Sequence, residues 1–194
     1  EGIVSDEDTT TSDTIIADIF FGGDLMQHGP QIKSALAMGG GNTYDYSDCF
    51  TFVKPIIEQA DLAIGNLEVT LGGAPYAGYP CFCAPDEYLY AIKAAGFDVL
   101  LTANNHCCDT RGRGLKRTIQ MLDSLNIPHC GTYTSKAERE KQYPLLVDVK
   151  GIKLALLNFT YDTNGLPIDA PNYVNLIDTA EIRRDIEKAK AMNP

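Results

Sequence analysis

The chain has 194 residues, of which 44% are hydrophobic and 22% are charged, and this composition suits one globular domain with a sizeable core. Its formal net charge of −10 and isoelectric point near 4.6 argue against nucleic-acid binding, because no basic stripe is present to displace counterions from phosphates. No run of about 18 apolar residues occurs, so no transmembrane segment is predicted in this chain.

The two ends of the chain have different sequence character. Residues 1–13 are acidic and rich in hydroxyl side chains, so we expect a flexible leader, such as follows a removed signal peptide or lipid anchor or is left by trimming for expression. Residues 187–191 read as a helix that stops at residues 192–194, as if the chain were cut between elements. We therefore expect residues 14–194 to be the N-terminal part of a domain that is truncated at its C-terminus.

The first half of the chain alternates between strand and helix patterns. In chain order we expect a strand over 14–23, a loop over 39–42, an amphipathic helix over 50–60, a strand over 62–65, a long surface loop over 71–85, a helix over 86–95 and a strand over 96–101. Pro55 is compatible with its helix only in the first turn. Asp86 is expected to cap the next helix, and Gly96 to end it in the left-handed conformation.

The second half continues the alternation and then adds a hairpin. We expect a helix over 115–125, a short strand or turn over 127–131, a hairpin of strands 145–149 and 152–159 around Lys150-Gly151, a loop over 160–175, and a helix from Asp178 with Glu181 completing a capping box. This order predicts an α/β domain with a mixed sheet packed between helices.

Polar residues follow three of the expected strands. These strand ends carry Gly22-Gly23-Asp24, Gly65-Asn66-Leu67-Glu68, and Thr102-Ala103-Asn104-Asn105-His106-Cys107-Cys108-Asp109. Ligands bind at the carboxyl ends of strands in open α/β sheets, so we expect these loops to meet around one hollow. Carboxylate, amide and imidazole groups there suit Mn, Mg, Fe or Zn holding a phosphate-like or carboxylate-like substrate.

Six cysteines stand at positions 49, 81, 83, 107, 108 and 130. Their even number permits disulfides, but the sequence does not choose a pairing. A zinc centre drawn from Cys81, Cys83, Cys107 or Cys108, and Cys130 with His129 is an alternative, although the usual two-residue spacer is missing. The simpler interpretation is that the thiols are unpaired and half-buried.

Several of these segments together resemble one protein family. Gly23-Asp24-Leu25-Met26, residues 61–68, Ala84-Pro85, residues 95–99, residues 103–109, Gly112-Arg113-Gly114-Leu115 and Gly131 are similar, in this order, to the CapA (PGA_cap) family of capsule and poly-γ-glutamate synthesis proteins. The resemblance covers about residues 15–160. It implies a four-layer α/β/β/α sandwich like that of calcineurin-like metallophosphatases, an extracytoplasmic, cell-envelope location, and a lipid or membrane anchor before processing.

The resemblance also suggests metal ligands. Asp24 matches the first Gly-Asp of the family, Glu68 stands where metallophosphatases place a bridging carboxylate, and Asn105 corresponds to the ligand asparagine of their Gly-Asn-His element. The alternatives are structural: Asp24 would cap the next turn, and Glu68 would pair with Arg111 or Arg113. A divalent metal (Mn, Fe, Zn or Mg) is therefore expected in the full-length protein.

The resemblance assigns further roles around the metal. His106 would contact a phosphoryl oxygen or protonate a leaving group, and Asp109 would orient its ring. Asn66, Arg111 and Arg113 would bind substrate, or would instead hold their loop or be solvated. His28 does not fit the metallophosphatase spacing, and His129 is interpreted as structural.

One departure from the metallophosphatase pattern limits these expectations. No histidine follows His129, so the histidines that complete a dinuclear site are missing from this sequence. We expect the chain alone to be metal-free or weakly metallated, and inactive unless a further segment completes it. Two functions stay open: a metal-dependent hydrolase or transferase acting on an anionic polymer or phosphoester, and a non-catalytic module that binds the polymer or the membrane subunits of a synthesis complex.

Overall fold

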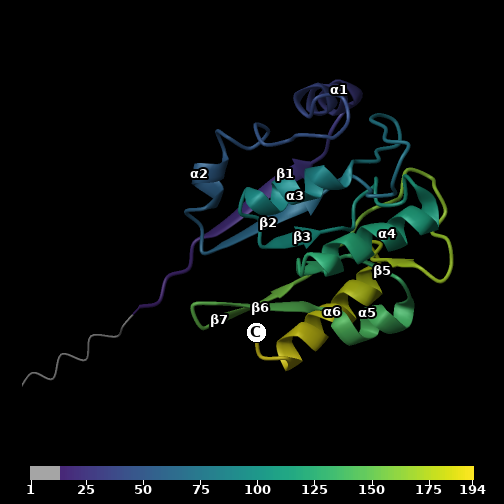
Figure 1. Ribbon diagram of the computed structural model, residues 1–194. Helices are drawn as coiled ribbons and strands as arrows, with labels where there is room; N and C mark the ends of the chain where they lie inside the picture. The colour runs from purple at the N-terminus through teal and green to yellow at the C-terminus, as the bar shows by residue number, and fades with distance from the viewer. Residues whose placement is uncertain (1–13) are drawn as a thin grey trace, which may run out of the picture.

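Four parallel strands form the central sheet and lie in the order in which they occur in the chain (Figure 1). A computed structural model describes residues 14–194, so the leader predicted for residues 1–13 lies outside the described residues. The strands are β1 (Ile19–Leu25), β2 (Leu62–Leu67), β3 (Val99–Leu101) and β4 (His129–Cys130). Because every neighbouring pair is parallel, the carboxyl ends of all four strands point to the same edge of the sheet.

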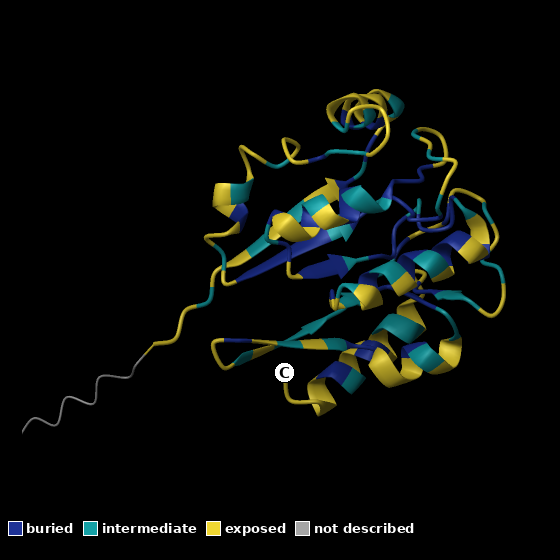
Figure 2. Cartoon of the chain, in the orientation of Figure 1, coloured by how far each residue is buried: buried dark blue, intermediate teal, exposed yellow. Residues whose placement is uncertain are grey.

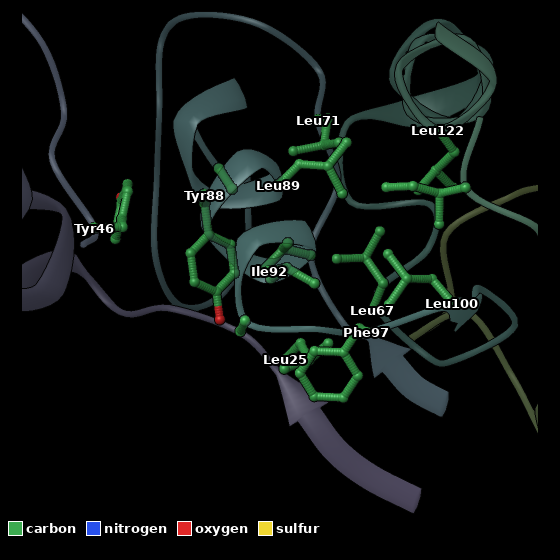
Figure 3. Close-up of a cluster of buried hydrophobic side chains, with 14 of the residues drawn as sticks. Leu25, Tyr46, Leu67, Leu71, Tyr88, Leu89, Ile92, Phe97, Leu100 and Leu122 are labelled. Carbon is green, nitrogen blue, oxygen red and sulfur yellow. The ribbon is translucent and has the colours of Figure 1, made fainter. Parts of the chain in front are cut away.

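Helices connect these strands and cover one face of the sheet. They are α1 (Gly29–Met38) and α2 (Lys54–Ile57) after β1, α3 (Asp86–Ala94) after β2, and α4 (Arg111–Ser124) after β3. Figure 3 shows the core that results, in which Leu89 and Ile92 of α3 and Leu122 of α4 meet Leu67 and Leu100 of the strands. All five side chains are at most 2% exposed, so this face supplies the main hydrophobic stabilisation of the domain.

A two-stranded hairpin covers the opposite face. Strands β6 (Leu145–Val149) and β7 (Ile152–Leu156) pair in antiparallel register, and their apolar side chains pack against Leu62, Ile64 and Val99. Lys150 and Gly151 both have positive φ, of 55° and 83°, as the predicted two-residue turn requires. The hairpin prediction is therefore confirmed.

The last part of the chain packs beyond the hairpin (Figure 1). It contains β5 (Thr132–Tyr133), α5 (Lys136–Gln142), β8 (Tyr173–Val174) and α6 (Thr179–Ala191), with β5 paired to β8 in antiparallel register. Arg139 of α5 is 2% exposed, and its guanidinium lies 2.5 Å from Asp185 Oδ2 and 2.6 Å from Asn175 Oδ1. This buried cluster fastens α5 to α6.

The structure is an α/β fold, as predicted, but its sheet is not mixed. The strands described in residues 14–194 form one all-parallel sheet and two separate antiparallel pairs. The predicted strand over 14–23 is displaced: β1 begins at Ile19 and continues through the glycines to Leu25. A chain can pair through glycines because the ladder uses only backbone groups, so glycines did not mark the end of this strand.

The helices show three further differences from prediction. The expected helix over 50–60 is reduced to α2, with Pro55 in its first turn. Because proline lacks an N–H and its ring clashes with a preceding helical turn, the helix cannot begin near residue 50. Its apolar stripe is not a buried face, since Phe52 is 91% exposed. Asp86 is the first residue of α3 and not its cap, and its carboxylate binds Arg117. Helices α1 and α5 were not predicted.

Two helix ends follow their prediction. Gly96 has a φ of 103° directly after α3, and Asp178 caps α6 by accepting hydrogen bonds from the N–H groups of Ala180 and Glu181. The predicted capping box would also have the Glu181 side chain accept a hydrogen bond from the backbone N–H of Asp178. The Glu181 carboxylate instead accepts a hydrogen bond from the Tyr173 hydroxyl.

The segment over 71–85 is irregular, as predicted, but much of it is buried (Figure 2). Leu71, Phe82 and Ala84 are at most 1% exposed. Their polar backbone groups are satisfied inside the protein: Thr118 Oγ1 accepts the hydrogen bond of Leu71 N at 2.8 Å, and backbone bonds join this segment to itself. This segment therefore forms one wall of the core.

Within residues 14–194, none of the helices combines the length and the apolar character needed to cross a lipid bilayer.

Candidate functional site

One amide group holds two carboxylates together at the carboxyl edge of the parallel sheet. Asp24 lies near the end of β1, Asn66 lies near the end of β2, and Glu68 follows β2 directly. Asn66 Nδ2 donates to Asp24 Oδ1 at 2.7 Å and to Glu68 Oε2 at 2.9 Å. Hydrogen bonds from a neutral donor to ionised acceptors are short and strong. Two of the three expected strand ends therefore meet.

A second amide connects this pair to the third strand end. Asn104 is buried, and its Nδ2 donates to Asn66 Oδ1 at 3.1 Å and to the carbonyl of Leu67 at 2.8 Å. Its Oδ1 accepts the backbone N–H of His106 at 3.1 Å. Sequence reasoning selected Asn105 and missed Asn104 as a site residue. Only its place beside Asn105 in the same strand-end loop could have drawn attention to it.

His106 is held in a fixed orientation from two sides. Its Nδ1 lies 2.8 Å from Asp109 Oδ2, and the same carboxylate oxygen accepts the backbone N–H of Phe82 at 2.6 Å. The Phe82 ring stands perpendicular to the imidazole, with the ring centroids 4.7 Å apart. Burial raises the pKa of the Asp109 carboxyl, and the hydrogen bonds from Phe82 and His106 oppose this effect. The predicted contact between Asp109 and His106 is present, and it leaves Nε2 as the ring atom that can act elsewhere.

The pKa of Glu68 is affected by charged groups at both other strand ends. Burial raises the pKa of Glu68, the neighbouring Asp24 carboxylate raises it further, and His106 lowers it. Two carboxylates that share one donor repel each other, and a cation between them would remove that repulsion. The three residues expected to meet, Asp24, Glu68 and His106, are connected by the hydrogen bonds of Asn66 and Asn104.

The three residues that the resemblance suggests as metal ligands carry oxygen donors. Asp24 and Glu68 supply carboxylate oxygens, and Asn105 supplies an amide oxygen, the ligand types that Mg²⁺ and Mn²⁺ accept. Within residues 14–194, no group of three or more His, Cys, Asp or Glu side chains is arranged to hold a metal. The residue types present are chemically compatible with a hard divalent cation.

The arginines predicted to bind substrate lie beside the site on α4. Arg111 Nη2 lies 2.7 Å from Asp169 Oδ1, and Arg113 is exposed on the first turn. Among the described residues, Glu68 forms no ion pair with an arginine, so the structural alternative in which Arg111 or Arg113 neutralises Glu68 is wrong. Asn105 Nδ2 donates to Asn164 Oδ1 at 3.3 Å.

The side chains of the remaining histidines and of the cysteines form no hydrogen bond with this network in the described part of the chain. His129 Nε2 contacts Asp123 Oδ1 at 3.2 Å, which agrees with a structural role. The His28 ring packs perpendicular to Phe82, with centroids 5.0 Å apart, so it shares an aromatic neighbour with His106. All six cysteines are unpaired, and those considered for a zinc centre do not gather with His129 into a metal-binding group in the described part of the chain.

The fold and the site define an α/β protein that gathers carboxylate, amide and imidazole groups at the carboxyl edge of a parallel sheet. The model of the bacterial capsule synthesis protein family PGA_cap matches residues 18–193, and the chain belongs to this family.

Its relatives include two capsule proteins of bacilli. The chain is 30% identical to the capsule biosynthesis protein CapA of Bacillus anthracis over 71% of its length, and 25% identical to the PGA biosynthesis protein CapA of Bacillus subtilis (strain 168) over 91% of its length. It is also 30% identical, over 46% of its length, to the uncharacterized protein y4sH of Sinorhizobium fredii (strain NBRC 101917 / NGR234). The alignments cover 33%, 48% and 21% of these relatives, so the chain spans at most about half of their length.

Proposed function

We propose that this chain belongs to a capsule or poly-γ-glutamate biosynthesis protein whose strand-end site binds one divalent cation and acts on an anionic polymer or a phosphoester. The observation that carries the proposal is the pair of carboxylates, Asp24 and Glu68, clamped by the Asn66 amide and placed near an oriented imidazole. The printed names of the CapA relatives support the biosynthetic context.

The residues of the site would divide the chemistry among them. Asp24, Glu68 and the Asn105 Oδ1 would hold the cation, which would polarise a phosphoryl or carbonyl oxygen of the substrate. Asp109 keeps Nδ1 of His106 occupied, so Nε2 is the atom that would donate a proton to the leaving group. Arg113 and, through its exposed guanidinium, Arg111 would attract anionic groups of the substrate.

The larger context of the site is also a proposal. We infer a four-layer α/β/β/α sandwich of metallophosphatase type, in which the hairpin β6–β7 belongs to the second sheet and further strands complete it. An extracytoplasmic protein, held by a lipid or membrane anchor and working beside membrane subunits of a polymer-synthesis complex, fits a role in capsule formation. The missing ligands of a complete site would come from outside residues 14–194.

Calorimetric titration with Mn²⁺ tests the cation site. We expect weak binding at one site, abolished in Asp24→Asn and in Glu68→Gln, because each variant removes one of the two carboxylates. Asp18→Asn is the matched control, since it removes an exposed carboxylate close to the start of β1 and should leave binding unchanged. Absence of binding, or binding that both site variants retain, would refute the cation site, whereas tight binding would contradict the expectation of weak metallation.

The alternative function is a non-catalytic subunit that binds the polymer or scaffolds its export complex. The small number of candidate ligands favours it, because within residues 14–194 no group of three or more His, Cys, Asp or Glu side chains is arranged to hold a metal. His106→Ala and Glu68→Ala in the full-length protein separate the two functions. Lost polymer production with an unchanged fold and complex would support chemistry, and unchanged production would support the scaffold.

A further inference from the structure

The segment 160–172, between β7 and β8, docks on the first turn of α4, which directly follows the site loop. The Asp169 carboxylate accepts hydrogen bonds from Arg111 Nη2 at 2.7 Å and from the backbone N–H of Gly112 at 2.9 Å. Asn172 Nδ2 donates to the carbonyl of Gly112 at 3.2 Å. A Cβ on Gly112 would lie 2.6 Å from Asn172 Nδ2 and 2.7 Å from Asp169 Cβ, so this close approach requires a glycine.

A tight turn in this segment presents Asn164 to the site. Thr163 Oγ1 donates to the carbonyl of Leu166 at 2.6 Å, and Gly165 N donates to Asp162 Oδ2 at 3.2 Å. Asn164 and Gly165 have φ values of 53° and 71°, a left-handed conformation that asparagine and glycine adopt most readily. The turn is thus held by its own bonds, and the Asn164 side chain is available to contact other segments.

Asn164 contacts two site residues at once. Its Oδ1 accepts the hydrogen bond of Asn105 Nδ2 at 3.3 Å, and its Nδ2 lies 3.4 Å from His106 Nδ1. Asp109 lies closer to that ring nitrogen, at 2.8 Å, and carries a charge when ionised, so it determines the orientation of His106. The contact that Asn164 controls is therefore the one with Asn105.

We propose that Asn164 is a positioning residue that holds the Asn105 amide by its nitrogen and thereby directs Asn105 Oδ1 to the ligand. Without this bond the amide of Asn105 can rotate and present its NH₂ group, which a cation does not bind. This role for Asn164 rests on the proposed cation site, whereas the hydrogen bond itself does not. Asn164 lies outside the motifs by which the sequence resembles its family, on a segment that sequence reasoning treated only as a loop.

Asn164→Gly tests the proposal, because glycine removes the amide and tolerates the positive φ. Asn126→Gly is the matched control, since Asn126 is exposed, has a φ of 52° and lies after α4. The first measurement is hydrogen exchange of the Asn105 side-chain NH₂ by NMR, assigned with Asn105→Asp. We expect exchange about fivefold faster in Asn164→Gly, the factor for loss of one ordinary hydrogen bond, and no change in the control. Unchanged exchange in Asn164→Gly would overturn the proposal.

The second measurement is the affinity for Mn²⁺ by calorimetry. We expect Asn164→Gly to weaken binding about tenfold, as for other residues that orient a metal ligand, and Asn126→Gly to leave it unchanged. If Asn164→Gly showed faster exchange but unchanged Mn²⁺ affinity, the orientation of the Asn105 amide would not matter for Mn²⁺ binding, and the positioning role would be overturned. Faster exchange in a protein whose wild type binds no Mn²⁺ would refute the cation site itself, and the hydrogen bond between the two asparagines would stand.

Discussion

Asn66→Asp would replace the amide that donates to two carboxylates with a third carboxylate. In the wild type, Asn66 Nδ2 donates to both Asp24 and Glu68, at 2.7 and 2.9 Å. The variant has nearly the same shape, so it changes the charge and the hydrogen bonding of the site while leaving the packing of β2 intact. We therefore expect its effect to be electrostatic.

Two terms set the size of the effect. Two hydrogen bonds to charged groups are lost, each about 1.5–3 kcal/mol when fully buried and about half of that at this partly exposed position. Repulsion between unit charges about 4 Å apart adds about 1 kcal/mol per pair in a water-like dielectric. With two new like-charge pairs, the free energy of unfolding should fall by about 3.5–5 kcal/mol, which corresponds to a Tm lower by roughly 7–20 °C for a domain of this size.

Thermal unfolding in EDTA and in excess MnCl₂ measures this change. A third carboxylate strengthens a cation site, so Mn²⁺ should raise the Tm of Asn66→Asp more than that of the wild type. At a Mn²⁺ concentration a hundred times its Kd, the free energy of unfolding of the variant should rise by about 2.7 kcal/mol. Asn126→Asp, at an exposed position, controls for the added charge. If Asn66→Asp were as stable as the wild type in EDTA, the amide clamp would have no energetic role and the reasoning would fail.

Three further predictions concern the supporting structure. Arg139→Met should lower the free energy of unfolding by about 3–5 kcal/mol in urea denaturation, because it leaves the buried Asp185 carboxylate without its partner. Gly131→Ala should destabilise the protein and speed hydrogen exchange at the end of β3, because its Cβ would lie 2.1 Å from Asn158 Oδ1 and 2.4 Å from the backbone N of Ala103. Asp61→Asn should show its full loss of stability above about pH 4 and a smaller loss at lower pH. The hydrogen bond with Lys150 lowers the pKa of Asp61, so the stabilisation is complete above the unfolded-state pKa and disappears as the pH falls through the folded-state pKa.

Each of these predictions has a control or a result that contradicts it. Arg183→Met removes an exposed arginine from α6 and should change stability little. Gly151→Ala shares the positive φ of Gly131 but has open space around its Cβ, so a loss of the same size in both variants would show that backbone conformation, and not the clash, is responsible. A constant difference between wild type and Asp61→Asn from pH 2 to pH 7 would refute the role given to its ionisation.

The sequence predicted the parts of the fold in which local pattern and tertiary packing agree. Leu115, Ile119 and Leu122 repeat at helical spacing and are buried on α4, and the Lys150-Gly151 pair forms the expected turn. Local pattern failed where tertiary contacts decide the outcome. The apolar spacing around Pro55 predicted a helix over 50–60, but Pro55 prevents the helix from beginning near residue 50, and Phe52 is 91% exposed.

The site shows the same division. The strand-end position of Asp24, Glu68 and His106 follows from the order of strands, and the structure connects these residues through hydrogen bonds. The connecting amides could not be predicted, because Asn104 and Asn164 act through contacts that join residues 37 to 59 positions apart. Spacing along the chain carries no information about such contacts, and their polar side chains look the same as those of any solvated loop.

The irregular segment over 71–85 has a practical consequence for anyone who modifies this protein. Phe82 lies in the core, and its backbone N–H binds the carboxylate that orients His106, so a peptide tag or a protease cut here would disturb the core and the proposed site together. Insertions and fluorescent labels belong instead at the glycine turns near Gly40 and Gly151, which have open space around them. Secondary-structure class is thus a poor guide to where this chain tolerates engineering.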